Sequence, residues 1–206
     1  MAQHFRVHPE NPQRRLLRQA SEILRRGGVI VYPTDSAYAL GCRLGERDAL
    51  ERIRAIRQLD ETHHFTLACR DLSEISLYAR VSDSVFRKLK AHTPGPYTFV
   101  LPGTKQVPKR LMHPKQRTIG LRVPANQIAQ ALLEELGEPL MTTTLILPGE
   151  ELPLSDPDTI AERLAKRIDL ILDAGPGGIE PTTLVDLSED VPVVLRRGRG
   201  DAAAFS

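Results

Sequence analysis

The sequence predicts an α/β fold in which one open, twisted mixed sheet carries helices on its flanks. Short apolar runs rich in β-branched residues alternate with segments of helical period through most of the chain, a pattern typical of α/β sheets. No linker, repeat or low-complexity segment divides the 206 residues, and this length suits one domain with a buried core. We therefore expect residues 1–206 to form a single domain.

The stretch from Gly27 to Gly41 carries the first candidate for a functional site. An apolar run, Val29–Tyr32, predicts a strand that ends at Pro33, which has no N–H to donate to a neighbouring strand. The polar residues 34–36 follow, at the strand end where open α/β sheets bind ligands. The alternative is a capped corner between this strand and the apolar segment 37–40. Both interpretations stay open.

Helical segments are recognised by apolar residues three and four positions apart or by capping residues. In the first segment Leu17, Ala20 and Leu24 share one face, arginines occupy the other, and Gly27 and Gly28 end the helix. The predicted helices are 12–26, 48–58, 71–79, 82–91, 126–136 and one that begins at Pro157 after a cap at Ser155 or Asp156.

The remaining strands follow from apolar runs and from alternation with period two. They are predicted at 63–70, 97–101, 117–123, 140–147, 168–172, 182–187 and 193–195. Alternation places Thr118, Gly120 and Arg122 on one face of their strand, so that a hydroxyl and a cation share it. An edge strand wetted on one side would show the same pattern.

Charge is distributed unevenly although the net charge is only +2. Residues 84–133 contain no Asp or Glu, and the loop 102–116 with the residue after it holds the candidate RNA-binding residues Lys105, Lys109, Arg110, Lys115 and Arg117. Clustered cations gain by releasing the counterions of phosphates, and few aromatic residues are interleaved for stacking on single strands. Duplex RNA or tRNA is therefore the expected polyanion, and solvated basic faces are the alternative.

Several classes of protein are not expected from this composition. Cys42 and Cys69 have no second Cys or His at metal-ligand spacing, so we expect neither a disulfide framework nor a metal site. No apolar window of about eighteen residues suggests a membrane span, and the first residues lack the apolar centre of a secretory signal. The expectation is a cytoplasmic protein of unspecified oligomeric state.

Five motifs in order along the chain resemble the YrdC/YciO family, and its YciO branch in particular. They are GGVIVYPTDSAYALG, TPGPYTFVL, TIGLRVPANQIAQALL, GEPLMTTTLILPG and PTTLVDLSEDVPVVLRRGRGD. The resemblance implies the YrdC-like fold, which is similar to that of DHBP synthase. It also implies a nucleotidyltransferase that makes threonylcarbamoyl-AMP from L-threonine, bicarbonate and ATP, releases pyrophosphate and serves tRNA modification. ATP would enter as a substrate, with Mg²⁺, and no prosthetic group is implied.

The resemblance also assigns residues. It implies Ser36, Arg122 and Thr182 for threonine, Thr118, Thr144 and Arg196 for the nucleotide, and Arg57 and Thr144 as catalytic residues. Cations are needed because two anions, the carbamate and the triphosphate, must approach in line.

The chain departs from the family's synthases at several positions. Their Lys-x-Arg reads Arg57-Gln58-Leu59 here, their Ser-x-Asn reads Thr144-Leu145-Ile146, and Ala68 stands where they can show His. We expect a weakened synthase with RNA-binding capacity. The alternatives are a catalytically silent RNA-binding protein in tRNA or rRNA processing and a related ligation of another small acid. Leu59 and Ile146 are predicted to pack together in the pocket, unless each fills a local gap independently.

Overall fold

The computed structural model describes residues 1–60, 62, 63 and 65–205. Its helices are α1 (Arg14–Arg25), α2 (Arg47–Arg57), α3 (Leu72–Tyr78), α4 (Asp83–His92), α5 (Gln127–Leu136) and α6 (Pro157–Leu164), with short 3-10 turns η1 (Lys109–Leu111) and η2 (Ala202–Phe205). Its strands are β1 (Gln3–Arg6), β2 (Ile30–Tyr32), β3 (Ala39–Arg43), β4 (Thr66–Ala68), β5 (Tyr97–Pro102), β6 (Thr118–Arg122), β7 (Leu140–Thr144), β8 (Leu170–Asp173), β9 (Thr183–Asp186) and β10 (Val193–Arg196).

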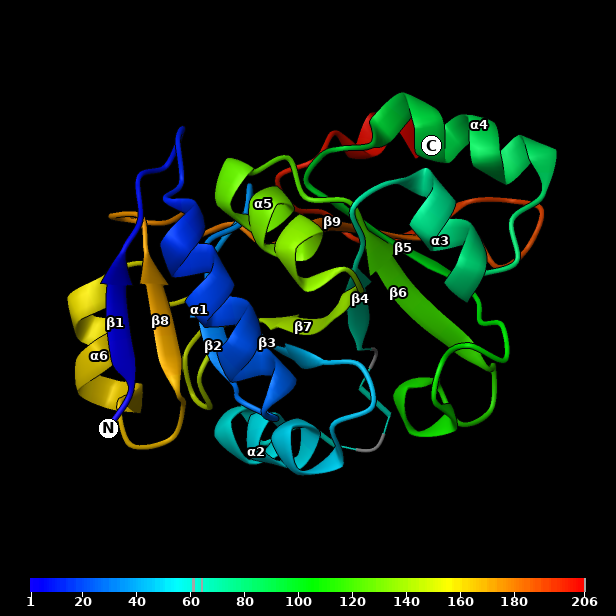
Figure 1. The fold of residues 1–206 in the computed structure, drawn as a ribbon. Coiled ribbons are helices and arrows are strands. Elements are labelled where there is room, and N and C mark those ends of the chain that lie inside the picture. The colour runs from blue at the N-terminus through cyan, green and yellow to red at the C-terminus, as the bar shows by residue number, and fades with distance from the viewer. Residues whose placement is uncertain (61, 64, 206) are drawn as a thin grey trace.

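The described residues form one ten-stranded sheet in the order β1-β8-β2-β3-β7-β4-β6-β5-β9-β10 (Figure 1). The sheet is mixed, because pairs such as β4 with β6 and β5 with β9 are parallel whereas β3 with β7 and β9 with β10 are antiparallel. The predicted mixed α/β sheet is confirmed. The sheet brings β2, β7, β6 and β9 together from distant parts of the sequence.

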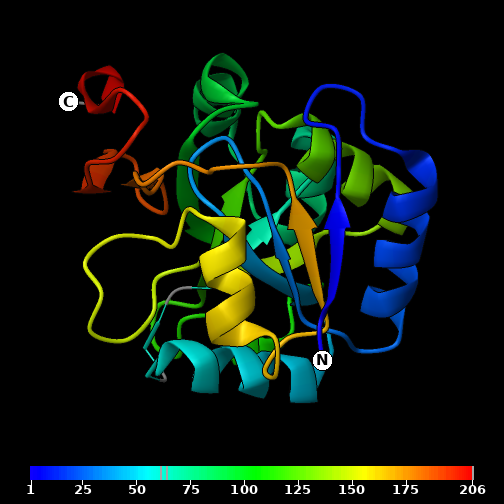
Figure 2. The ribbon, with the colours of Figure 1, turned by 90° about the vertical axis from the view of Figure 1, so that its left-hand side faces the viewer.

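Helices cover both faces of the sheet. Helices α1 and α5 pack together and bury Leu24 and Leu132 against Tyr32, Leu140 and Leu170. These residues form one hydrophobic cluster, and residues of α2, α4 and α6 belong to a second cluster on the opposite face. Along the strands, side chains of the second cluster alternate with side chains of the first. Figure 2 shows β1 and β8 side by side, with α6 and α1 on opposite sides of them. A sheet covered on both sides is rigid enough to hold polar groups at its strand ends.

Local signals in the sequence set most element boundaries. Asn126 caps α5 by accepting the N–H of Ala129 at 3.0 Å, and Gly137 ends the helix with φ of 79°. Asp156, not Ser155, caps α6 by accepting the N–H of Thr159 at 2.8 Å. Among the described residues, no helix combines the length and the apolar character that crossing a membrane requires.

The structure differs from the strands expected in three places. Strand β1 was not predicted, because its side chains show no apolar alternation; the strand is held by parallel pairing with β8. Strand β7 ends at Thr144 instead of Leu147, because the chain turns after Leu145, where the N–H of Ile146 bonds the carbonyl of Thr144 at 2.9 Å. The predicted strand 63–70 shortens to Thr66–Ala68, and residue 64 of that prediction lies outside the described residues.

Candidate active site

The corner between β2 and β3 both caps the chain and contributes to a site. The Thr34 hydroxyl donates to the carbonyl of Ala37 at 2.6 Å and accepts the N–H groups of Ser36 and Ala37, each at 3.2 Å. Asp35 and Ser36 instead face Arg122 at the end of β6. Thr34 thus caps the corner, as one interpretation expects, whereas the contacts of Asp35 and Ser36 with Arg122 leave the ligand-binding interpretation a prediction.

Arg122 is a buried cation held in a fixed orientation. Its Nη2 donates to Asp35 Oδ1 and its Nη1 to Ser36 Oγ at 3.4 Å, while Asp35 Oδ2 accepts the N–H of Ala125 at 2.8 Å. The side chains of Arg122 and Asp35 are only 6% and 10% exposed. The buried Nε of Arg122 has no hydrogen-bond partner among the described residues. The guanidinium is therefore anchored on one side and keeps unused donor capacity.

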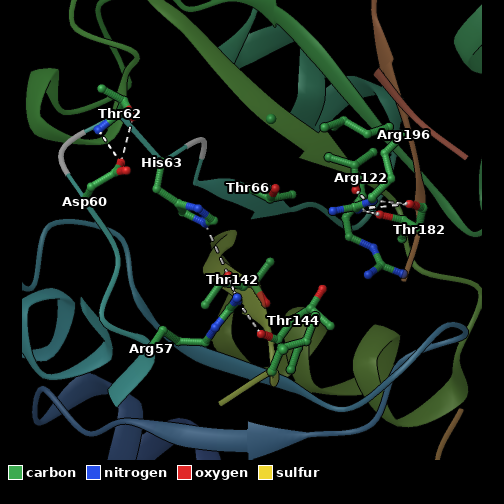
Figure 3. Close-up of a pocket in the computed structure, with 16 residues that line it drawn as sticks. Arg57, Asp60, Thr62, His63, Thr66, Arg122, Thr142, Thr144, Thr182 and Arg196 are labelled. Carbon is green, nitrogen blue, oxygen red and sulfur yellow. Dashed lines mark hydrogen bonds between the residues drawn. The ribbon is translucent and has the colours of Figure 1, made fainter. Parts of the chain in front are cut away.

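A cavity of about 390 Å³ opens beside Arg122 (Figure 3). Its charged lining residues among those described are Arg57, Asp60, Arg122 and Arg196, so positive charge exceeds negative charge. The other lining residues are Ala39, Thr62, His63, Thr66, Thr98, Gly120, Thr142, Thr143, Thr144, Ile146, Thr182 and Leu184. This size is within the range of small-molecule sites, and the charge favours an anionic ligand.

Arg57, the last residue of α2, lies across the cavity from Arg122 and Arg196 in Figure 3. Its Nη1 donates to Thr143 Oγ1 at 2.8 Å and to the carbonyl oxygen of Thr144 at 2.5 Å. Burial, together with the charge of Arg196, lowers the pKa of Arg57 to about 10. An anion bound between these two arginines would relieve their repulsion.

Arg196, at the end of β10, reaches the cavity from the opposite side. Its Nε and Nη2 both donate to the carbonyl of Thr182, at 3.0 and 2.9 Å, and Nη2 also donates to Thr182 Oγ1 at 3.1 Å. The Thr182 hydroxyl lies 2.7 Å from Thr98 Oγ1. Part of Arg196 is in solvent; burial of the rest and the charge of Arg122 lower the pKa of Arg196.

The hydroxyl group of Thr142, on the floor of the cavity, is oriented by hydrogen bonds to buried groups. Thr142 Oγ1 accepts the hydroxyl of fully buried Tyr32 at 2.8 Å and donates to the carbonyl of Leu40 at 3.0 Å. Gly120 lies between Thr66 and Thr98, and a Cβ on it would approach Thr66 Oγ1 to 2.7 Å. The floor therefore presents fixed polar groups around a position where a side chain would not fit.

The structure brings most of the predicted site residues together and adds others. Ser36, Arg57, Arg122, Thr144, Thr182 and Arg196 lie in or directly beside the cavity. Four further lining residues, His63, Thr66, Thr98 and Thr142, were not predicted as site residues. The three threonines carry no signal of their own, because threonine is common in strands. Alternation could have indicated Thr142, which shares the face of Thr144.

Three expectations do not match the cavity. Leu59 is not among the described residues that line it; it lines a separate surface pocket with Arg54, Lys109, Met112 and Pro114, so an apolar corner shared with Ile146 is wrong. The reason is Gln58, whose left-handed backbone (φ 51°) reverses the chain after α2.

Thr118 and Ala68 also lie outside the described cavity lining. Thr118 pairs with Pro102 at the opposite end of β6 from Arg122, and its buried hydroxyl has no hydrogen-bond partner among the described residues. The cavity therefore gives no support to the nucleotide-binding role predicted for Thr118. Ala68 is fully buried in the cluster of α1 and α5.

The basic residues predicted for RNA lie on the β5–β6 connection, outside this cavity lining. Lys105, Lys109, Arg110, Lys115 and Arg117 are all exposed. Lys109 and Arg110 border the surface pocket that contains Leu59, and Arg110 Nη2 donates to the carbonyl of Gly45. The surface and the cavity are thus separate features.

Comparisons with known proteins find relatives over nearly the whole chain. The family model Sua5_yciO_yrdC, described as "Telomere recombination", matches residues 22–198. YciO of Escherichia coli K12 is 58% identical over 205 residues, with 100% of both chains covered, and its crystal structure superimposes with a TM-score of 0.98. A threonylcarbamoyl-AMP synthase of Chromobacterium violaceum is 35% identical over 184 residues, covering 87% of this chain and 92% of the synthase.

The crystal structure of P. abyssi Sua5 in complex with L-threonine is also similar, with a TM-score of 0.87 and 26% identity. That match covers 95% of this chain and 57% of Sua5. The resemblance drawn from the five sequence motifs is confirmed. The chain belongs to the Sua5/YciO/YrdC family and is related to its threonylcarbamoyl-AMP synthases.

Proposed function

We propose that this protein is a nucleotidyltransferase that condenses L-threonine, bicarbonate and ATP into threonylcarbamoyl-AMP and pyrophosphate, with lower activity than the family's synthases. The observation that supports this proposal best is the convergence of Arg57, Arg122 and Arg196 on one cavity lined by hydroxyl groups. A carbamate and a triphosphate carry several negative charges, and three fixed cations would hold them in line for reaction.

The threonine subsite is assigned to the Arg122 side of the cavity. Arg122 has a buried Nε with no partner among the described residues, and such a donor suits an amino-acid carboxylate. Ser36 contacts Arg122 directly and Thr182 contacts the neighbouring Arg196, and both hydroxyls would bind the substrate's polar groups. The crystal structure of the relative Sua5 in complex with L-threonine supports threonine as the substrate.

The nucleotide is assigned to Arg57, Thr144 and Arg196. The threonine amine would form a C–N bond to the carbon of bicarbonate, whose C–O(H) bond breaks so that water leaves and a carbamate remains. A carbamate oxygen would then bond the α-phosphorus, and the bond from that phosphorus to pyrophosphate would break. Arg57 and Arg196 would stabilise the charge that develops on the phosphates. The described residues contain no cluster of three metal-binding side chains, so we propose that Mg²⁺ enters bound to ATP.

The proposal is tested by pyrophosphate release. We expect release that needs ATP, bicarbonate and L-threonine together. Omission of any one of them should stop it. Release that continues without threonine would indicate simple ATP hydrolysis and contradict the proposed reaction, and no release above background would remove the enzymatic function.

Ile146 is expected to account for part of the weakened activity. It lines the cavity where the family's synthases carry Asn, whereas Leu59 lies outside it. Ile146→Asn should raise the rate of pyrophosphate release by about tenfold, the equivalent of one hydrogen bond in a low-dielectric site. Leu59→Arg is the matched control and should leave the rate unchanged. Equal effects of the two changes would contradict the placement of Leu59.

A second candidate function is binding of duplex RNA or tRNA, supported by the exposure of all five basic residues named above. Removing three of the positive charges, in Lys105→Ala, Lys109→Ala and Arg110→Ala combined, should weaken binding and lower the slope of log Kd against log salt by about two to three. Fluorescence anisotropy with a short RNA duplex measures both quantities. RNA binding whose affinity does not change with salt concentration would exclude this basic surface as the binding site.

A further inference from the structure

We propose that the C-terminal segment 198–205, here named the C-terminal clasp, is a positioning device that keeps Arg196 in the cavity by holding β10 in a bulged register. This inference rests on the proposed function of Arg196 in nucleotide binding. It adds that two other residues determine whether that arginine is available: Thr183, which lies between the lining residues Thr182 and Leu184, and Phe205 in an aromatic cluster. Both are buried, and neither is among the described residues that line the cavity.

The register of β10 contains one extra residue. Val193 is opposite Asp186 and Val194 is opposite Val185, but the next residue paired, opposite Leu184, is Arg196. Leu195 is therefore the inserted residue of a bulge, and its side chain is 49% exposed. Leu184 faces the cavity. Because the bulge places Arg196 directly opposite Leu184, the Arg196 side chain points to the same face of the sheet.

A regular register would give a different site. Continuing the pairs of Val193 and Val194 without a bulge would put Leu195 opposite Leu184, and Arg196 would point to the other face of the sheet. The cavity would then receive an aliphatic side chain in place of a guanidinium. A shift of β10 by one residue would therefore remove the positive charge of Arg196 from the cavity.

Contacts immediately after β10 hold the bulged register. The hydroxyl of Thr183 accepts the N–H of Gly198 at 3.1 Å and donates to the carbonyl of Gly200 at 2.5 Å. The N–H of Arg199 donates to the carbonyl of Pro181 at 2.9 Å. These bonds fix the position of the segment that follows Arg196 relative to the start of β9.

The end of the clasp is anchored in an aromatic cluster beside α4, where Figure 1 places the C-terminus. The Phe205 ring is 6% exposed and lies 4.5 Å from the ring of His92, 5.7 Å from that of Tyr97 and 5.9 Å from that of Phe99, measured between centroids. Gly200 packs on the Tyr97 ring so closely that a Cβ would come within 2.5 Å of it. Slippage of β10 by one residue would have to break these contacts.

The register is tested by disulfide trapping, which needs no substrate. Directly opposed residues of an antiparallel pair are close enough for a disulfide, and the native Cys42 and Cys69 are buried. In the otherwise unchanged protein, Leu184→Cys should cross-link with Arg196→Cys and not with Leu195→Cys. Adding Thr183→Val and Phe205→Ala should shift cross-linking toward position 195. The same pattern with and without the clasp changes would overturn the inference.

The consequence for binding is tested by titration calorimetry with ATP. Thr183→Val with Phe205→Ala should weaken ATP binding by about tenfold or more, as expected for one lost charged contact. Leu195→Arg should restore affinity in that variant, since position 195 then faces the cavity, and should change little in the intact protein. Phe5→Ala, in the strand at the opposite edge of the sheet, is the control and should not alter affinity.

Thr183→Val alone is the milder variant if the pair of changes unfolds the protein, a point that circular dichroism settles. Weakened ATP binding that Leu195→Arg does not restore would show a general loss of structure and contradict a register change. If the intact protein binds no ATP, the proposed function fails, and the cross-linking result still decides whether the clasp sets the register.

Discussion

Replacement of Arg122 by alanine is expected to lower the free energy of unfolding by about 3 to 5 kcal/mol, because it leaves the nearly buried carboxylate of Asp35 without its ion-pair partner. Urea denaturation measures this loss. The same change should reduce pyrophosphate release by about two to three orders of magnitude at a threonine concentration that saturates the intact protein, since Arg122 is the proposed partner of the threonine carboxylate.

The double change Arg122→Ala with Asp35→Ala separates these two effects. It removes both charges of the pair, so part of the lost stability should return while activity stays low. Full recovery of activity with stability would contradict a role for Arg122 in substrate binding. Unchanged stability in the single variant would contradict the buried ion pair.

Replacement of Arg196 by alanine is expected to weaken ATP binding by about a hundredfold and to leave the affinity for threonine within about twofold. A charged hydrogen bond to phosphate contributes about 1.5 to 3 kcal/mol, and Arg196 lies on the side of the cavity assigned to the nucleotide. Titration of each substrate separately measures the two affinities.

Arg196→Lys provides the matched control. Lysine keeps the positive charge but cannot donate two bonds to the Thr182 carbonyl as Nε and Nη2 of Arg196 do. Its ATP affinity should therefore lie between those of the intact protein and Arg196→Ala. An equal loss for ATP and threonine in Arg196→Ala would contradict the separation of the two subsites.

Sequence reasoning located the parts of the site that regular structure determines. Strand alternation placed Arg122 and Gly120 on one face of β6, and the proline after Tyr32 marked the end of β2, where Asp35 and Ser36 meet Arg122. The family motifs then joined these residues to Thr182 and Arg196, which are far away in sequence. Periodicity by itself could not have paired β5 with β6 and β9.

Two features of the site depend on places where the backbone leaves regular geometry, and neither was predicted. One residue in left-handed conformation, Gln58, decides that Arg57 reaches the cavity and Leu59 does not. The bulge at Leu195 decides which face receives Arg196, and in our proposal the anchoring of Phe205, several residues beyond the strand, holds it. The left-handed Gln58 belongs to the end of α2 itself, where the N–H of Leu59 bonds the carbonyl of Arg54 at 3.1 Å, but no glycine or asparagine marks this position in the sequence.

The most direct test of the proposed function is identification of the product. The protein would be incubated with ATP, ¹³C-bicarbonate and L-threonine, and the nucleotides would be separated and analysed by mass spectrometry, with L-serine and L-valine as competing amino acids. We expect an adenylate that contains one ¹³C and one threonine, formed more slowly in Arg196→Ala. Unlabelled AMP alone, or a labelled adenylate that forms equally well from valine, would contradict the proposal.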